Sequence, residues 1–129
     1  MTEYQPGVCN IGADEQRKRQ FAGAAGFLAA MTYVLAVVLA DSPTNYLLAT
    51  FVFLFGGFIG YFQARFRFCV AFAALARYDL SGSGGGTGTI SEAEALRRDR
   101  RQAVKITLYA AGAATVVTVV VYGIGLVML

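Results

Sequence analysis

The stretch FAGAAGFLAAMTYVLAVVLA, residues 21–40, decides the fold of this chain. It contains no charged residue, and only Thr32 and Tyr33 carry a polar group. At about 1.5 Å per residue, a helix of this length spans roughly 30 Å, which matches the hydrocarbon core of a bilayer. The stretch therefore predicts a transmembrane helix and not the helix of a soluble domain.

Two further uncharged runs follow, at residues 46–64 and 106–129. The polar turn at residues 41–45 separates the first run from the second, and its Pro43 prevents one helix from continuing through it. The first two runs therefore predict a helical hairpin, and the third predicts a separate span after a Gly-rich loop. Hydrophobic residues make up 57% of the chain, more than a soluble core requires. We expect an all-α integral membrane protein with three transmembrane helices.

The chain is predicted to have four parts. They are a cytoplasmic N-terminal segment (1–20), the transmembrane hairpin with an extension (21–77), a flexible Gly/Ser-rich cytoplasmic linker (78–91) and a charged helix that runs into the third span (92–129). Ser91 and Glu94 have the spacing of a capping box at the start of that helix. Residues 66–76 are apolar but too short to span, so they either form an interfacial segment or pack under the bundle.

All eleven lysine and arginine residues fall on one side of the membrane when three spans are drawn. They are Arg17, Lys18, Arg19, Arg65, Arg67, Arg77, Arg97, Arg98, Arg100, Arg101 and Lys105. Positively charged flanks stay in the cytoplasm during insertion. We therefore expect a multi-pass protein of the cell membrane, with its N-terminus in the cytoplasm and its C-terminus outside. Since this asymmetry explains the net charge of +3, we expect no nucleic acid partner.

Small residues recur at four-residue spacing in every predicted span, and small residues let membrane helices approach closely. The candidate helix-packing positions are Ala22, Gly26 and Ala30 in the first span, Gly56 and Gly60 in the second, and Ala110, Ala114 and Thr118 in the third. Such stripes hold the helices of one chain together or join the chain to a second copy. The sequence leaves both alternatives open.

The chain lacks side chains on which many membrane enzymes and pumps depend. It has no histidine, so imidazole ligands for zinc or haem and the usual general base are absent. No acidic or basic residue lies inside a predicted span, which argues against a proton-coupled transporter. We expect no catalytic residues, no metal site and no cofactor. A passive channel built from several copies and lined by hydroxyl groups stays an alternative.

The two cysteines, Cys9 and Cys69, are both predicted on the cytoplasmic side. Arg65 and Cys69 are four residues apart, which places two side chains on the same face of a helix. A neighbouring cation favours the nucleophilic thiolate form of cysteine. Cys9, Cys69 and Arg65 are therefore a candidate thiol site. The alternative is that both cysteines serve only as small apolar side chains.

Two short motifs resemble those of a known membrane domain. The first enters the predicted hairpin with Asn10, Gly12, Glu15, Arg19 and Gly23, and the second closes it with Phe68, Cys69, Val70, Phe72 and Leu75. Over residues 8–77 they resemble a small two-helix membrane domain of unknown function that is often fused to rhodanese sulfurtransferases. The chain departs from that pattern, since Gln16 stands where the family tends to have arginine, Val70 replaces a proline, and a linker and third helix are added.

The resemblance implies a membrane hairpin with Cys69 at its inner end, and it implies no defined activity. The first motif also has a physical interpretation of its own. Asn10 is expected to cap the first helix, and Glu15 is expected to complement the helix dipole and to pair with Arg19 one turn later.

The leading hypothesis is a small non-enzymatic membrane protein that acts as an accessory subunit or self-associating scaffold of a membrane complex. Its partners are then the lipid bilayer and either further copies of the chain or other membrane subunits. One alternative is a membrane thiol protein that handles sulfur or redox equivalents through Cys9 and Cys69. The other is an oligomeric channel.

Overall fold

The computed structural model describes residues 4–82 and 85–128. Residues 1–3 of the predicted N-terminal segment, residues 83–84 of the predicted linker and residue 129 of the third run lie outside the described residues. The elements are α1 (Ala13–Leu39), the 3₁₀ helix η1 (Thr44–Ala49), α2 (Thr50–Phe66), α3 (Val70–Ala74), β1 (Arg77–Asp79), β2 (Thr87–Thr89) and α4 (Ala93–Met128).

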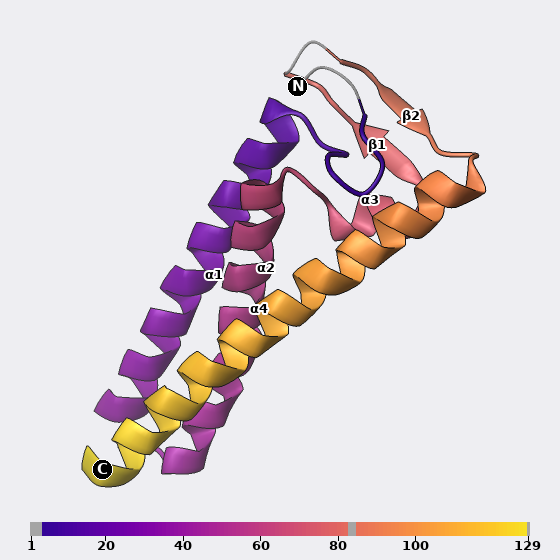
Figure 1. Ribbon diagram of the computed structural model, residues 1–129. Coiled ribbons are helices and arrows are strands. Elements are labelled where there is room, and N and C mark those ends of the chain that lie inside the picture. The colour runs from indigo at the N-terminus through magenta and orange to yellow at the C-terminus, as the bar shows by residue number, and fades with distance from the viewer. Residues whose placement is uncertain (1–3, 83–84, 129) are drawn as a thin grey trace.

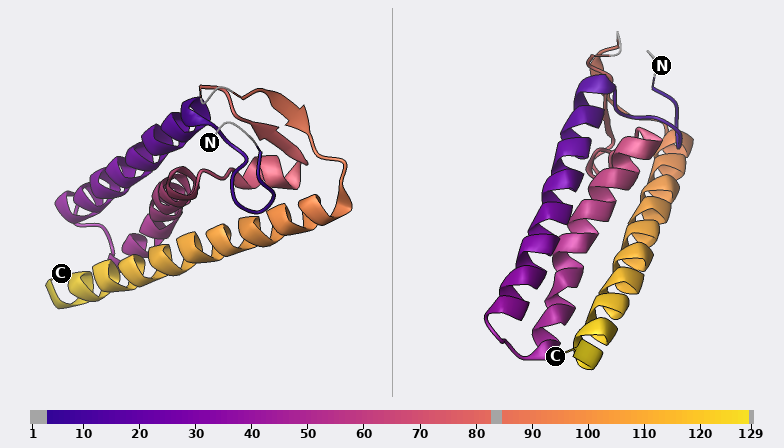
Figure 2. Two further views of the ribbon diagram at one scale, coloured as in Figure 1. Left: turned by 45° about the horizontal axis from the view of Figure 1, so that its top comes forward. Right: turned by 90° about the vertical axis from the view of Figure 1, so that its left-hand side faces the viewer.

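Three helical stretches of the described residues are long and apolar enough to cross a membrane: Ala13–Leu39, Thr44–Phe66 and Ala93–Met128. The prediction of three transmembrane helices is therefore confirmed, and the chain is a multi-pass membrane protein. Figure 1 shows α1 antiparallel to α2, with α4 crossing α2 at an angle. The two views of Figure 2 agree that α2 contacts α1 on one side and α4 on the other.

The basic residues all belong to parts of the chain that lie at one end of the bundle. This basic end comprises the start of α1, the end of α2, α3, the β1–β2 hairpin and the start of α4, while η1 and the C-terminus lie at the opposite end (Figure 1). The 36-residue α4 is about 54 Å long, roughly 24 Å longer than a hydrocarbon core. Its charged first turns therefore extend beyond the apolar part of the bundle.

Glycines bring α1 and α2 into direct backbone contact. A Cβ atom at Gly26 would lie 2.5 Å from the nitrogen of Gly57, and one at Gly60 would lie 2.6 Å from the nitrogen of Gly23. No side chain fits at such distances, so these four glycines set how closely the hairpin packs. Gly57 takes the place in this contact that the four-residue spacing assigned to Gly56, where a Cβ would meet nothing within 4 Å.

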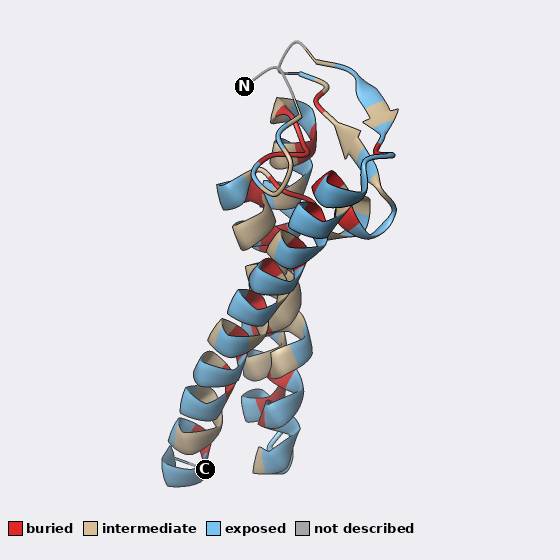
Figure 3. Cartoon of the chain, turned by 45° about the vertical axis from the view of Figure 1, so that its right-hand side comes forward, coloured by how far each residue is buried: buried red, intermediate tan, exposed pale blue. Residues whose placement is uncertain are grey.

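The other predicted packing positions divide between the interior and the surface. In α4, Ala110, Ala114 and Thr118 are all buried, and Ala114 belongs to a core cluster with Ala30 of α1 and Leu54 of α2. Ala22 is exposed. Most of the stripe residues therefore hold the helices of a single chain together. Figure 3 shows the same division, with buried positions on the inner side of α4 and exposed positions along its outer side.

Phe66 ends α2, and residues 67–76 do not continue this helix. Arg67 caps α2 in the left-handed conformation, with φ at 53°, and the chain then turns into the short helix α3. Phe68 and Ala73 are fully buried, and they form a core cluster with Ile106 of α4. At Phe68 and Ala73 the segment therefore packs against the bundle, and its position at the membrane interface stays a prediction.

The Gly/Ser-rich stretch differs from the predicted linker because part of it forms an antiparallel hairpin. Tyr78 of β1 pairs with Gly88 of β2, where a Cβ would collide with the tyrosine ring. The N-terminal segment runs beside β1: the Gly12 amide donates to the Asp79 carbonyl at 2.7 Å, and the Asp79 amide donates to the Asn10 carbonyl at 2.9 Å. The N-terminal segment is thus part of the fold of the basic end.

Gly60→Ala is expected to lower the free energy of unfolding by about 1–3 kcal/mol, because the added methyl forces the two backbones apart. Gly56→Ala is the matched control, since it makes the same substitution on the same helix and meets nothing within 4 Å. Thermal unfolding in a mild detergent, followed by circular dichroism, measures both. Equal unfolding temperatures for the two variants would contradict the glycine contact.

Candidate functional site

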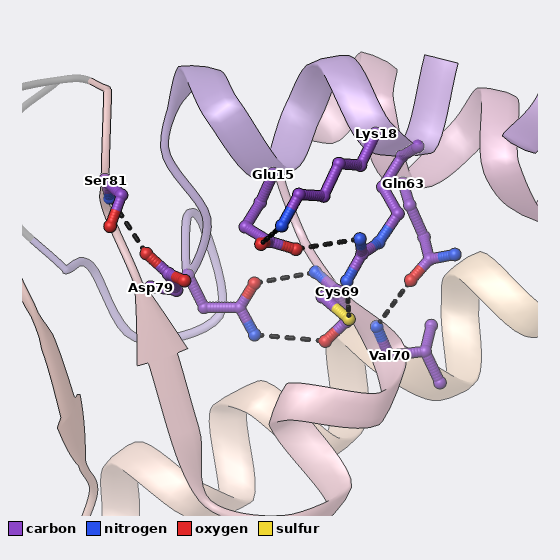
Figure 4. A network of polar contacts seen from close by, with 9 residues as sticks. Glu15, Lys18, Gln63, Cys69, Val70, Asp79 and Ser81 are labelled. Carbon is purple, nitrogen blue, oxygen red and sulfur yellow. Dashed lines mark hydrogen bonds and ion pairs between the residues drawn. The ribbon is translucent and has the colours of Figure 1, made fainter. Parts of the chain in front are cut away.

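A network of polar side chains lies around Cys69, in the loop between α2 and α3. Side chains from the N-terminal segment, α1 and α2 converge there (Figure 4). We call this group the Cys69 network, and its members are Asn10, Glu15, Lys18, Arg19, Gln63 and Cys69. Cys69 itself is only 1% exposed. The centre of the network therefore lies inside the basic end, and Lys18 is its exposed member.

The Asn10 side chain forms two hydrogen bonds with the backbone of Cys69. Its Nδ2 donates to the Cys69 carbonyl at 3.1 Å, and its Oδ1 accepts from the Cys69 amide at 2.6 Å. Asn10 is fully buried, so both bonds replace water that cannot reach these groups. The expectation that Asn10 caps the first helix is wrong: the N-cap is Gly12, and no side chain bonds there.

Arg19 connects α1 to the cysteine sulfur. Its Nη2 donates to Cys69 Sγ at 3.0 Å, its Nη1 donates to Glu15 Oε2 at 2.8 Å, and its guanidinium carbon lies 5.6 Å from the centre of the Phe72 ring. The expected Glu15–Arg19 pair is therefore present. Lys18 also contacts Glu15 at 2.8 Å, but its side chain is mostly exposed, so this second ion pair contributes little stability.

The predicted thiol site of Cys9, Cys69 and Arg65 is not assembled as expected. Because α2 ends at Phe66, Arg65 and Cys69 do not share a helix, and Arg19 is the arginine that contacts the sulfur. Cys9 is buried as well, and its thiol donates to the Ile11 carbonyl at 3.3 Å. Both cysteines are free, and their sulfur atoms have different partners.

The two glycines of the helix-entry motif also lie at close contacts. A Cβ at Gly12 would collide with the backbone of Leu80 and Ser81, and one at Gly23 would lie 3.0 Å from the Gly57 carbonyl oxygen. All five positions of the motif therefore contact the hairpin, α2 or the Cys69 network: Asn10, Gly12, Glu15, Arg19 and Gly23. The spacing of the motif follows from contacts that hold the start of α1 in place.

A second buried polar contact joins the N-terminal segment to α4, and sequence reasoning missed it. Asp99 is fully buried, and it accepts hydrogen bonds from the Tyr4 hydroxyl at 2.6 Å and the Gly7 amide at 2.7 Å. Burial, together with the bond to Asp99, raises the pKa of Tyr4 above its ordinary value. The signal in the sequence was a single aspartate inside the basic run at residues 97–101.

The hydroxyl groups of α4 differ in their partners. Thr107 and Thr115 donate to carbonyl oxygens one turn earlier in the same helix, at 2.8 and 2.7 Å, as membrane helices commonly allow. Thr118 of α4 and Thr50 of α2 have buried hydroxyls without a partner among the described residues. Residues 4–82 and 85–128 contain no group of three or more cysteine and acidic side chains that could hold a metal ion.

Comparisons of the chain with protein-family models, curated proteins and solved structures found no match. The chemistry of the Cys69 network is therefore interpreted from its own geometry. Its hydrogen bonds hold α1 against the loop between α2 and α3, and they keep a guanidinium group against a cysteine sulfur.

Asn10→Ala is expected to lower the free energy of unfolding by about 1–3 kcal/mol, because it leaves the buried amide of Cys69 unpaired. It is also expected to speed the labelling of Cys69 by a maleimide. The control is Asn45→Ala, which removes an exposed asparagine at the opposite end of the bundle. Unchanged stability and labelling in Asn10→Ala would show that the two hydrogen bonds do not hold this loop.

Proposed function

We propose that this chain is a small non-enzymatic subunit of a membrane complex that associates through the outer face of α4. The observation that supports this proposal is the position of two α4 glycines, Gly112 and Gly123, at which a Cβ would meet nothing within 4 Å. Glycine destabilises a helix by about 1 kcal/mol relative to alanine. Packing within one chain requires neither glycine, whereas close contact with another helix would use both.

The surroundings of these glycines fit such a contact. Gly112 and Gly123 share their helix face, at successive spacings of three and four residues, with Leu108, Val116 and Val119, and each of these three side chains is more than 60% exposed. On this face the two glycines carry no side chain, and Val116 and Val119 lie between them. Surfaces of this kind let two membrane helices approach closely, whether the second helix comes from another copy or from a different subunit.

We also propose that the basic end faces the cytoplasm and that the C-terminus lies outside the cell membrane. The support for this orientation is that all eleven lysine and arginine residues belong to the elements of that end. The contact surface on α4 would then lie within the bilayer, where water does not compete for it.

We also propose that residues 8–77 share the architecture of the two-helix membrane domain often fused to rhodanese sulfurtransferases. The support for this proposal is that Asn10 and Arg19 of the entry motif contact Cys69 of the closing motif, and that Glu15 pairs with Arg19. A shared set of contacts would explain why motifs some 50 residues apart occur together. This proposal concerns architecture, and it assigns no sulfur chemistry to the chain.

A second candidate function is that of a membrane thiol protein in sulfur or redox handling, and the contact between Arg19 and Cys69 Sγ favours it. Cations beside cysteines are found at reactive thiols. Of the alternatives that the sequence left open, an oligomeric channel gains no such support, since Thr107 and Thr115 bond within their own helix.

Gly112→Ile is expected to abolish association without lowering the unfolding temperature of the single chain, because a Cβ at this position meets nothing within 4 Å. The test is gentle extraction of the tagged protein, followed by native mass measurement and identification of copurifying subunits. Ala25→Ile, at an exposed position of α1, controls for added bulk. A wild-type protein extracted only as a lone monomer would refute the proposal.

If the thiol function holds, Cys69 is expected to react with a small neutral alkylating reagent faster than Cys9, and Arg19→Gln is expected to slow this reaction. Mass spectrometry of the labelled peptides at several times gives both rates. Arg17→Gln removes an exposed arginine two residues away and serves as the control. Equal rates for the two cysteines, unaffected by Arg19→Gln, would exclude a reactive thiol.

A further inference from the structure

A cleft of about 500 Å³ opens between α1 and α2 at the basic end. Arg65, Arg67 and Gln20 line it together with apolar residues that include Ala24 and Phe27. Pockets that bind small molecules commonly enclose about 300–1,000 Å³. The cleft is therefore large enough to take a ligand, and it combines cationic and apolar surface.

The two arginines of the cleft are free to bind an anion. Among the described residues, neither Arg65 nor Arg67 forms an ion pair, whereas Arg19 and Arg98 each pair with a glutamate. The residues that line the cleft include no carboxylate. Two guanidinium groups without a counterion favour a phosphate, which accepts paired hydrogen bonds from arginine.

The backbone fixes one of these arginines at the cleft. Arg67 adopts a left-handed conformation at the end of α2, and its carbonyl accepts the Asn10 amide at 3.2 Å. This contact anchors the Arg67 backbone to the buried N-terminal segment. Arg65 lies in the last turn of α2 and borders the same cleft.

The depth of the cleft along the bundle fits the boundary between lipid headgroups and acyl chains. On α1 its apolar lining belongs to the first turns of the uncharged run at residues 21–40, and on α2 its arginines follow the run at residues 46–64. A free phosphate would leave the apolar lining at Ala24 and Phe27 uncovered. A phospholipid would cover both the arginines and that lining, and basic pockets between transmembrane helices bind such lipids.

We propose that this cleft binds an anionic phospholipid. Arg65 and Arg67 hold its phosphate group, Gln20 donates a further hydrogen bond, and one acyl chain lies along Ala24 and Phe27. The site is separate from the outer face of α4, so lipid binding and subunit association are independent properties of the chain.

The test is a titration of the purified full chain in mild detergent, followed by native mass spectrometry. The probes are phosphatidylglycerol, phosphatidylcholine with the same acyl chains, and inorganic phosphate. We expect phosphatidylglycerol to bind most tightly. We expect the double variant Arg65→Gln/Arg67→Gln to weaken its binding roughly 25-fold, about fivefold for each arginine. Ala24→Phe, which fills the apolar part of the cleft, is expected to weaken binding of both lipids.

Arg97→Gln/Arg100→Gln is the matched control, because it removes the same charge from exposed positions of α4. It is expected to bind phosphatidylglycerol as the wild type does. Circular dichroism establishes that each variant is folded, and Arg65→Gln alone replaces the double variant if the latter unfolds. Equal losses in the two double variants, or equal binding of the two lipids by the wild type, would overturn the proposal. Arginine-dependent binding of inorganic phosphate that Ala24→Phe leaves unchanged would also overturn it in favour of a soluble anion.

Discussion

The basic end depends on the two hydrogen bonds between the side-chain amide of Asn10 and the backbone of Cys69. The chain leaves α2 at Arg67 and enters α3 at Val70, and the Cys69 amide between them bonds to the Asn10 side chain instead of to a helix carbonyl. Unpaired backbone groups are costly in an environment without water. Asn10 satisfies the amide and carbonyl of Cys69, and Gln63 accepts the Val70 amide at 2.9 Å. The side chains of Asn10 and Gln63 thus stabilise the buried break between α2 and α3.

Once this break is stabilised, the other parts of the basic end have fixed positions. The N-terminal segment must cross the bundle to bring Asn10 to Cys69, and it then lies beside β1 and reaches Asp99 of α4. The same crossing places Arg19 against the sulfur atom of Cys69. The entry motif and the loop at Cys69 are far apart in the sequence, and these contacts bring them together.

Much of the fold could be predicted because it depends on composition along continuous stretches. Long uncharged runs identify the three spans, and a four-residue spacing identifies the Glu15–Arg19 pair. The errors concern contacts between distant residues, such as Asn10 and Cys69, which local spacing does not encode. Helical periodicity assigned Arg65 to Cys69 because a helix break at Arg67 has no strong signature without glycine or proline. The β1–β2 hairpin was missed because a glycine-rich stretch has the composition of a linker even when one of its glycines pairs in a strand.

The N-terminal segment also constrains the order in which the molecule can be completed during synthesis. Tyr4, Asn10 and Gly12 are made first, yet their partners Asp99, Cys69 and Asp79 leave the ribosome only later. The hairpin of α1 and α2 can enter the membrane before any of these contacts exist. The contacts of Asn10 and Gly12 become available once Asp79 has been translated, whereas Tyr4 has to wait for Asp99 of α4, so its contact with α4 is the last of the three to become available.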